Sequence, residues 1–63
     1  MDDRLRDFYE DRRLSVAEHG SHVKVKGPAR VLQAMAIDLY RRGIGSVLRV
    51  MGLDGELELE VRP

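Results

Sequence analysis

The sequence predicts a single small α+β domain in which two helices alternate with two pairs of strands. Hydrophobic residues recur with helical spacing in two segments and alternate with polar residues in the segments that follow each of them. The chain has 63 residues, which is enough for one hydrophobic core, and no linker or repeat divides it. We therefore expect one domain over 1–63. A short N-terminal helix over 1–12 precedes a ββαββ core over 13–63, in which one longer helix covers an antiparallel-rich four-stranded sheet.

The first segment has the pattern of a short amphipathic helix. Leu5, Phe8 and Tyr9 recur at helical spacing, with Met1 one turn earlier. Acidic residues at the start of the segment and arginines at its end suit the helix dipole. Because so short a helix is not stable alone in water, we expect it to pack on the second face of its own sheet or on another chain.

The next segment, "RLSVAEHGSHVKVKG", predicts a β-hairpin. Leu14 and Val16 alternate with smaller or polar residues before the turn, and Val23 and Val25 do so after it. Gly20 in the turn supplies the positive φ that a tight connection needs. We expect these four hydrophobic side chains to share one buried face.

The segment "GPARVLQAMAIDLYRRG" predicts the longer helix. Gly27 is the expected cap, Pro28 the first helical residue, and Gly43 follows the last turn. Ile37 falls nearly opposite the stripe expected to cover the sheet. That stripe consists of Val31, Leu32, Met35 and Leu39.

Two further strands complete the predicted fold. The first, "SVLRVM", is apolar on both faces, which is typical of a central strand. A turn with Asp54 and Gly55 at its tip leads into "ELELEV", whose alternation predicts the last strand. Its charges would discourage pairing with other sheets if the strand lay at an edge, and the sequence leaves the order of the strands open.

The glutamates of the last strand raise the question of a site. Glu56, Glu58 and Glu60 project to one side, and Lys24 and Lys26 repeat the arrangement on another strand. If the two strands are neighbours, the rows face each other, and each pair contributes about 0.2–1 kcal/mol and helps to fix the register. Alternate residues of a strand lie too far apart to converge on a cation. We interpret the glutamates as structural.

The sequence contains no motif that indicates catalysis, a metal or a cofactor. "EHGSH" supplies two histidines, but no cysteine or further histidine completes a zinc site. No nucleophile has an evident base beside it. "VKVKGPAR" resembles a phosphate-binding turn, yet Pro28 removes a backbone donor and the glycine spacing of a P-loop is missing. We expect a protein that is not an enzyme and binds no cofactor or metal.

Charge and hydropathy restrict the partners. Eleven basic residues balance eleven acidic ones, so the positive field of a nucleic-acid binder is missing. The segment "MDDRLRDFYEDRR" is not a secretory signal and no apolar run is long enough to span a membrane, so we expect a cytoplasmic protein without membrane contact. Nucleic-acid binding is the alternative hypothesis, through the cations Lys24, Lys26, Arg30, Arg41, Arg42 and Arg49.

The sequence has more apolar residues than one helix and one sheet face can bury. This surplus predicts a small self-associating protein-interaction module, a homodimer first of all, that binds a protein partner. A third hypothesis, a ligand-binding or enzymatic oligomer, places Tyr40 or Arg49 in a pocket between subunits. The expected interface residues are Met1, Leu5, Phe8, Ile37, Val47 and Met51.

The order helix, strand pair around "GSHVKVKG", helix and then "GIGSVLRV" resembles the BON domain pattern. In that pattern a valine-alternating strand ends in glycine, and a later glycine-valine segment starts another strand. The resemblance covers roughly two thirds of the chain and implies a fold analogy. The BON family is associated with envelope proteins and phospholipid surfaces, but the resemblance assigns no function or site residue to this chain.

Overall fold

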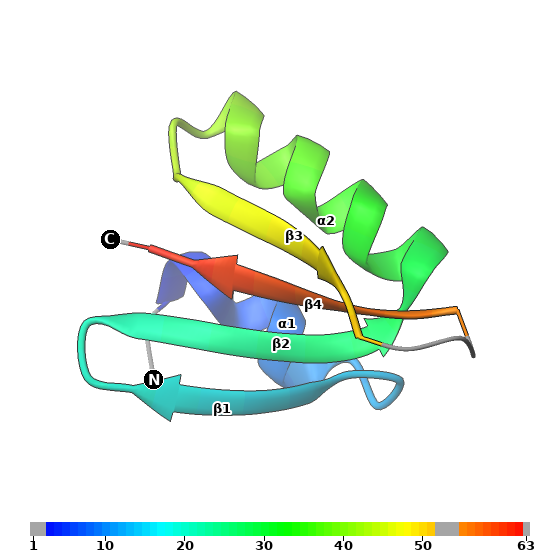
Figure 1. The fold of residues 1–63 in the computed structure, drawn as a ribbon. Coiled ribbons are helices and arrows are strands. Elements are labelled where there is room, and N and C mark those ends of the chain that lie inside the picture. Colours follow the sequence, from blue (N-terminus) through cyan, green and yellow to red (C-terminus); the bar gives the residue numbers. More distant parts are fainter. Residues whose placement is uncertain (1–2, 52–54, 63) are drawn as a thin grey trace.

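The computed structural model describes residues 3–51 and 55–62. It confirms the predicted α+β fold, with all neighbouring strands antiparallel and the order β1-β2-β4-β3 (Figure 1). Met1, expected at an interface, and Asp54, expected in a turn, lie outside the described residues. The elements are a 3₁₀ turn η1 (Asp3–Leu5), α1 (Arg6–Glu10), β1 (Ser15–His19), β2 (His22–Pro28), α2 (Ala29–Arg41), β3 (Ser46–Val50) and β4 (Glu56–Val61).

Strands β1 and β2 form the expected hairpin. His19 pairs with His22 across a two-residue turn. Gly20 has a φ of 62° and no described residue other than glycine has a positive φ, which matches a type II′ turn with glycine at its first central position. On the inner face of the hairpin Val25 is fully buried, and the partly buried side chains packed around the core include Leu14, Val16 and Val23.

Helix α2 begins one residue later than predicted. Pro28 has an extended backbone (φ −60°, ψ 139°) and is the residue before the first helical one, because Gly27 and Pro28 still pair with β4 as part of β2. Gly27 therefore does not cap the helix. At the other end the expected stop is confirmed, since the chain leaves the helix through Arg42 and Gly43, which has a φ of 77°.

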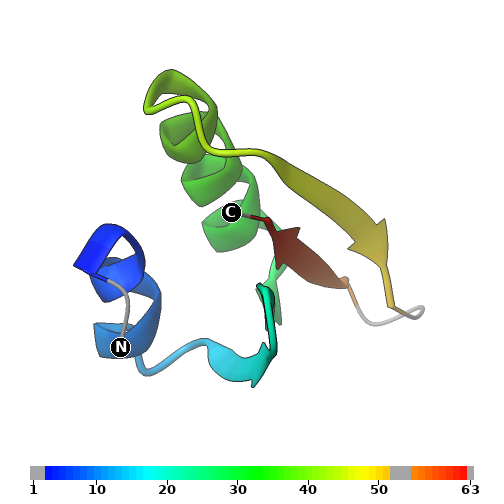
Figure 2. The same ribbon diagram turned by 90° about the vertical axis from the view of Figure 1, so that its left-hand side faces the viewer.

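Both helices cover the same face of the sheet (Figure 2). The expectation that the N-terminal helix would pack on the second face or on another chain is wrong. Leu5 and Phe8 are buried in the same core as the α2 side chains, because α1 lies beside α2 and shares the apolar layer between helices and sheet. No helix or strand of the described residues covers the second face of the sheet, which we call the open face. The buried hydrophobic core comprises Leu5, Phe8, Val25, Leu32, Leu39, Leu59 and Val61.

The apolar strand β3 is not central as predicted. The charged strand β4 is central, and the apolar strand β3 lies at an edge of the sheet (Figure 1). Leu59 of β4 pairs with Val25 on one side and with Leu48 on the other. A strand that carries charges on one face can be central here, because only its other face, with the fully buried Leu59, enters the core.

Candidate interaction surface at strand β3

The open face of the sheet carries rows of opposite charge. Lys24 pairs with Glu60 and Lys26 with Glu58, so the two rows face each other across β2 and β4. On the other side of β4, Arg49 of β3 pairs with Glu58. Neighbouring side chains cover both carboxylates, and Glu58 and Glu60 are only 6% and 8% exposed.

Glu60 is the centre of this charged layer. Its carboxylate accepts a hydrogen bond of 3.1 Å from Nη2 of Arg49. Arg62 Nη2 lies 3.9 Å and His22 Nε2 3.7 Å from the same carboxylate. Three strands or their ends thus supply partners to one side chain, which supports the structural interpretation of the glutamate row. Over residues 3–51 and 55–62, no group of three or more His, Asp or Glu side chains could hold a metal ion.

The hairpin turn places its two histidines side by side. The rings of His19 and His22 stack with centroids 5.8 Å apart. They lie on the open face at the end of the β1–β2 ladder, where His22 also reaches Glu60. This arrangement is a local cross-strand pair and does not gather further ligands in the described part of the chain.

One ionisable pair outside the sheet has shifted pKa values. The Arg13 side chain donates two hydrogen bonds to Asp11, of 3.0 and 2.8 Å, and its backbone N–H donates a third of 2.9 Å. These bonds lower the pKa of Asp11, and the carboxylate in turn raises the pKa of Arg13. The pair shapes the connection between α1 and β1.

The exposed large hydrophobic side chains of the described residues gather at one border of the molecule. They come from α2, from β3 and from the residue after β3. Ile37, Val47 and Met51 were expected at an interface, Tyr40 was expected in a pocket between subunits under the third hypothesis, and Leu48 and Val50 were missed. The six are Ile37, Tyr40, Val47, Leu48, Val50 and Met51.

Two expected interface residues do not belong to this border. Leu5 and Phe8 are 4% and 3% exposed within the single chain, so they are core residues and have no surface to offer a partner. The signal that could have identified Tyr40 is its spacing from Ile37 and Gln33, which forms a second stripe on α2. Leu48 and Val50 were not expected at the surface, because the segment was predicted to be a central strand.

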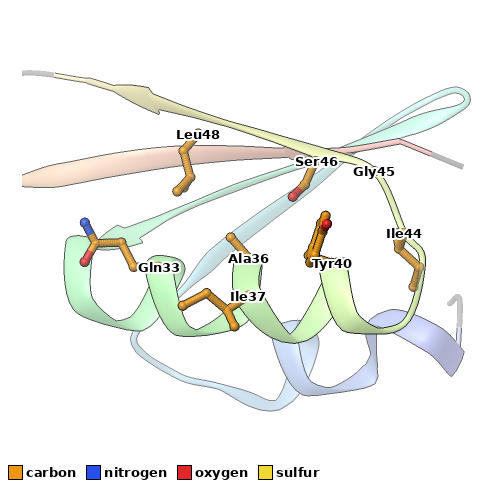
Figure 3. A pocket seen from close by; sticks show the side chains of 8 residues that line it. All are labelled: Gln33, Ala36, Ile37, Tyr40, Ile44, Gly45, Ser46 and Leu48. Carbon is orange, nitrogen blue, oxygen red and sulfur yellow. The ribbon is translucent and has the colours of Figure 1, made fainter.

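A groove of about 610 Å³ runs between α2 and β3 (Figure 3). Leu48 points from the strand toward the helix, and Ala36 and Tyr40 point from the helix toward the strand. Tyr40 is 84% exposed and Ile37 56%. The groove is an apolar recess with few polar groups. It is lined by Gln33, Ala36, Ile37, Tyr40, Ile44, Gly45, Ser46 and Leu48.

Beside the groove runs the unpaired edge of β3. Met51 N–H donates to the Glu56 carbonyl at 3.2 Å, and Arg62 N–H donates to the Gly45 carbonyl at 2.9 Å. Backbone hydrogen bonds alternate along an antiparallel pair of strands. The N–H and C=O groups of the odd-numbered residues of β3 therefore point toward β4. The peptide groups of the even-numbered residues, Ser46, Leu48 and Val50, point away from the sheet. No strand of the described chain pairs with them.

The opposite edge of the sheet is protected. Glu18 of the edge strand β1 accepts a hydrogen bond from the Tyr9 hydroxyl group of α1. A charged side chain is a common means of blocking an edge strand. The molecule therefore has one guarded edge and one apolar edge. We call the apolar edge, with its six exposed hydrophobic side chains and the adjoining groove, the β3 surface.

The cations of the nucleic-acid hypothesis are divided between two parts of the molecule. Lys24, Lys26 and Arg49 stand beside glutamates on the open face of the sheet. The other three belong to α2 or its C-terminal end. Among these, Arg42 lies 2.6 Å from Asp38 and 3.7 Å from Asp7. The structure does not bring the six residues together into one basic surface.

Comparisons with protein-family models, with curated proteins and with solved structures found no match. The resemblance to the BON domain pattern thus remains a likeness in the order of elements. Among the described residues, neither helix is long and apolar enough to cross a membrane.

Proposed function

We propose that this protein is a small non-enzymatic interaction module that self-associates through the β3 surface. One observation carries the proposal: every large hydrophobic side chain that is exposed in the described structure lies along the same border as an unpaired strand edge. Contiguous apolar surface on a soluble domain marks sites of protein contact. An unpaired, apolar strand edge is a template for pairing with another chain.

The size of the chain supports the same proposal. A domain of 63 residues buries a limited share of its surface, and the largest side chains that are fully buried among the described residues are Val25, Leu32 and Leu59. Covering apolar surface stabilises a protein by about 25 cal/mol per Å². Association through the β3 surface adds to the stability that the single core supplies, as is common for small domains.

The open face then becomes the surface that a self-associated form presents to a protein partner. It carries both charges, and the carboxylate of Glu60 is already paired with Arg49 and Arg62 of the same chain. Polar surfaces of this kind contribute to the choice of partner more than to affinity. The β3 surface and the open face share the edge strand, whose Val47 and Arg49 face the open side.

The test is the molar mass in solution, measured by light scattering after size exclusion at low and high salt and over a range of concentrations. The natural chain is expected to form a dimer that persists at high salt, because the contact is apolar. Ile37→Lys places a charge in the groove and is expected to yield a monomer. Ala34→Lys is the matched control, since Ala34 is exposed on the same helix but does not line the groove.

Two outcomes would contradict this function. A natural chain that stays monomeric at all concentrations has no self-association to explain. A dimer that survives Ile37→Lys unchanged associates through some other face. Circular dichroism of both lysine variants shows whether they keep the fold, so that loss of association is separated from loss of structure.

A further inference from the structure

We propose that the strand that completes the β3 edge is β3 of a second copy, antiparallel to the first, with a twofold axis at Leu48. The proposal rests on the proposed function and specifies the partner and the register. It makes each chain contribute both the strand that pairs and the helix that closes the groove. The product is one continuous eight-stranded sheet, because each copy supplies a four-stranded one.

The alternation of hydrogen-bonding groups along β3 favours an axis at Leu48. Leu48 is the middle residue of the strand Ser46–Val50, and its N–H and C=O groups point away from β4. Two such residues related by a twofold axis exchange both hydrogen bonds. All five residues of the strand then take part in the pairing, with Ser46 opposite Val50 of the partner subunit.

The charges of the strand favour the same register. With Leu48 on the axis, Val47 stands opposite the partner's Arg49, so no like charges are directly opposed. An axis at Arg49 would place two guanidinium groups directly across from each other, which is destabilising. It would also leave part of the strand unpaired. In the proposed register Arg49 keeps its ion pair of 3.1 Å with Glu60.

The groove explains why the partner is a second copy and not an isolated strand. Leu48 points toward α2 and is 39% exposed. A foreign strand would satisfy the peptide groups of β3 but leave the apolar wall of α2 in water. A second copy brings its own α2 to the same side of the sheet, so Ile37 and Tyr40 of both chains close over the two Leu48 side chains. Sheet and helix layers both continue across the axis.

The guarded edge explains why the assembly stops at two chains. Pairing of β3 with β1 of another copy would be head to tail and would propagate as a filament. At the β1 edge the Glu18 carboxylate accepts a hydrogen bond from Tyr9 of α1. Pairing with β3 of another copy would bring this charge against the apolar β3 surface, which is unfavourable. Twofold pairing of β3 with β3 of the second copy buries the apolar edge of both chains, so no apolar edge is left to bind a third chain.

Disulfide cross-linking tests the register directly, because the natural chain contains no cysteine. Three single variants of the full chain are prepared: Leu48→Cys, Val47→Cys and Arg49→Cys. Paired residues in an antiparallel ladder have Cα atoms about 4.5–5.5 Å apart, within the range of a disulfide. Diagonal neighbours lie about 7–8 Å apart, at or beyond its limit.

The expected pattern is specific. Leu48→Cys shifts from one chain to two on a non-reducing gel under mild oxidation. Val47→Cys and Arg49→Cys each remain single chains, and an equimolar mixture of the two gives the mixed dimer. Mass spectrometry identifies the mixed species. Addition of Ile37→Lys to Leu48→Cys is expected to abolish the cross-link, which shows that it forms in the dimer and not by chance collision.

The outcomes distinguish this proposal from the function on which it rests. If light scattering shows a dimer but Leu48→Cys does not cross-link, or Val47→Cys cross-links with itself, the register is wrong while self-association stands. If the natural chain is a monomer throughout, both proposals fail. A cross-link of Leu48→Cys that Ile37→Lys does not reduce would overturn the role given to the groove.

Discussion

Gly27 shows how a single residue can be required for a reason that its sequence context does not reveal. A Cβ atom at this position would lie 2.6 Å from Cδ2 of Leu14 and 3.1 Å from the carbonyl oxygen of Arg13. The glycine lets the start of the hairpin pass close to the end of β2. Its place before a proline and a helical pattern predicted a cap instead.

We predict that Gly27→Ala destabilises the protein by about 1–3 kcal/mol, the usual cost of forcing an extra group into a packed site. Chemical denaturation followed by circular dichroism measures the change. Gly45→Ala is the control, because nothing lies within 4 Å of a Cβ built there and its φ is not positive. Gly45 lines the groove, so both variants are compared in the monomeric Ile37→Lys background. Equal stability of the two variants would show that Leu14 moves aside at little cost.

At the scale of the element, β4 combines an apolar inner face with a carboxylate row on its outer face. The row is accommodated at the centre of the sheet because cations flank it from β2 and β3. The contribution of each ion pair to the stability of the fold depends on how far its side chains are buried. The Glu60 side chain, which forms an ion pair with Arg49, is 11% exposed. In the ion pair between Asp3 and Arg6 the side chains are 86% and 57% exposed.

We predict a coupling free energy of about 0.5–1 kcal/mol between Arg49 and Glu60, measured by a double-mutant cycle with Arg49→Met and Glu60→Gln. The same cycle with Arg6→Met and Asp3→Asn is expected to give less than about 0.5 kcal/mol, because water screens that pair. Both cycles are run in the monomeric Ile37→Lys background, so that association does not contribute. Equal couplings would argue against the importance of burial.

Helix α2 also illustrates the scale of the element, because it carries two stripes with different roles. Leu32 and Leu39 are buried against the sheet, as their spacing predicted. Ile37 and Tyr40 form the wall of the groove. The first stripe stabilises the fold of one chain, and we assign the second to contact between chains.

At the scale of the whole molecule, the two helices fill one side of the sheet and leave β3 at its margin. Self-association would link stability to concentration, since anything that binds only the folded state stabilises it. We predict that the Tm of the natural chain rises with protein concentration. Each tenfold increase adds about 1.4 kcal/mol to the stability of a dimer, which corresponds to a rise of a few degrees.

Calorimetry or circular dichroism over a hundredfold range of concentration measures this effect. The Tm of Ile37→Lys is expected to be independent of concentration, and that of Ala34→Lys to follow the natural chain. A natural chain whose Tm stays constant over the range would contradict a dimer that dissociates on unfolding.

Most of the fold followed from local patterns in the sequence. The period of two in the hairpin, the period of 3.6 in α2 and the turn at Gly20 are properties of short segments, and the structure has all three. The candidate surface was predicted only in part. Ile37, Val47 and Met51 are exposed as expected, whereas Leu5 and Phe8 are buried, because hydrophobicity alone does not tell which face of the molecule a helix covers.

The sequence by itself determined the type and order of the elements and the alternation of charge that makes two strand rows complementary. These depend on residues close together in the chain. Only the tertiary structure decided that β4 lies between β2 and β3, that α1 packs beside α2, and that β3 is left at an apolar edge. Strand order and helix placement depend on contacts between distant segments, and an amphipathic pattern fixes which side of an element is apolar without fixing its neighbour.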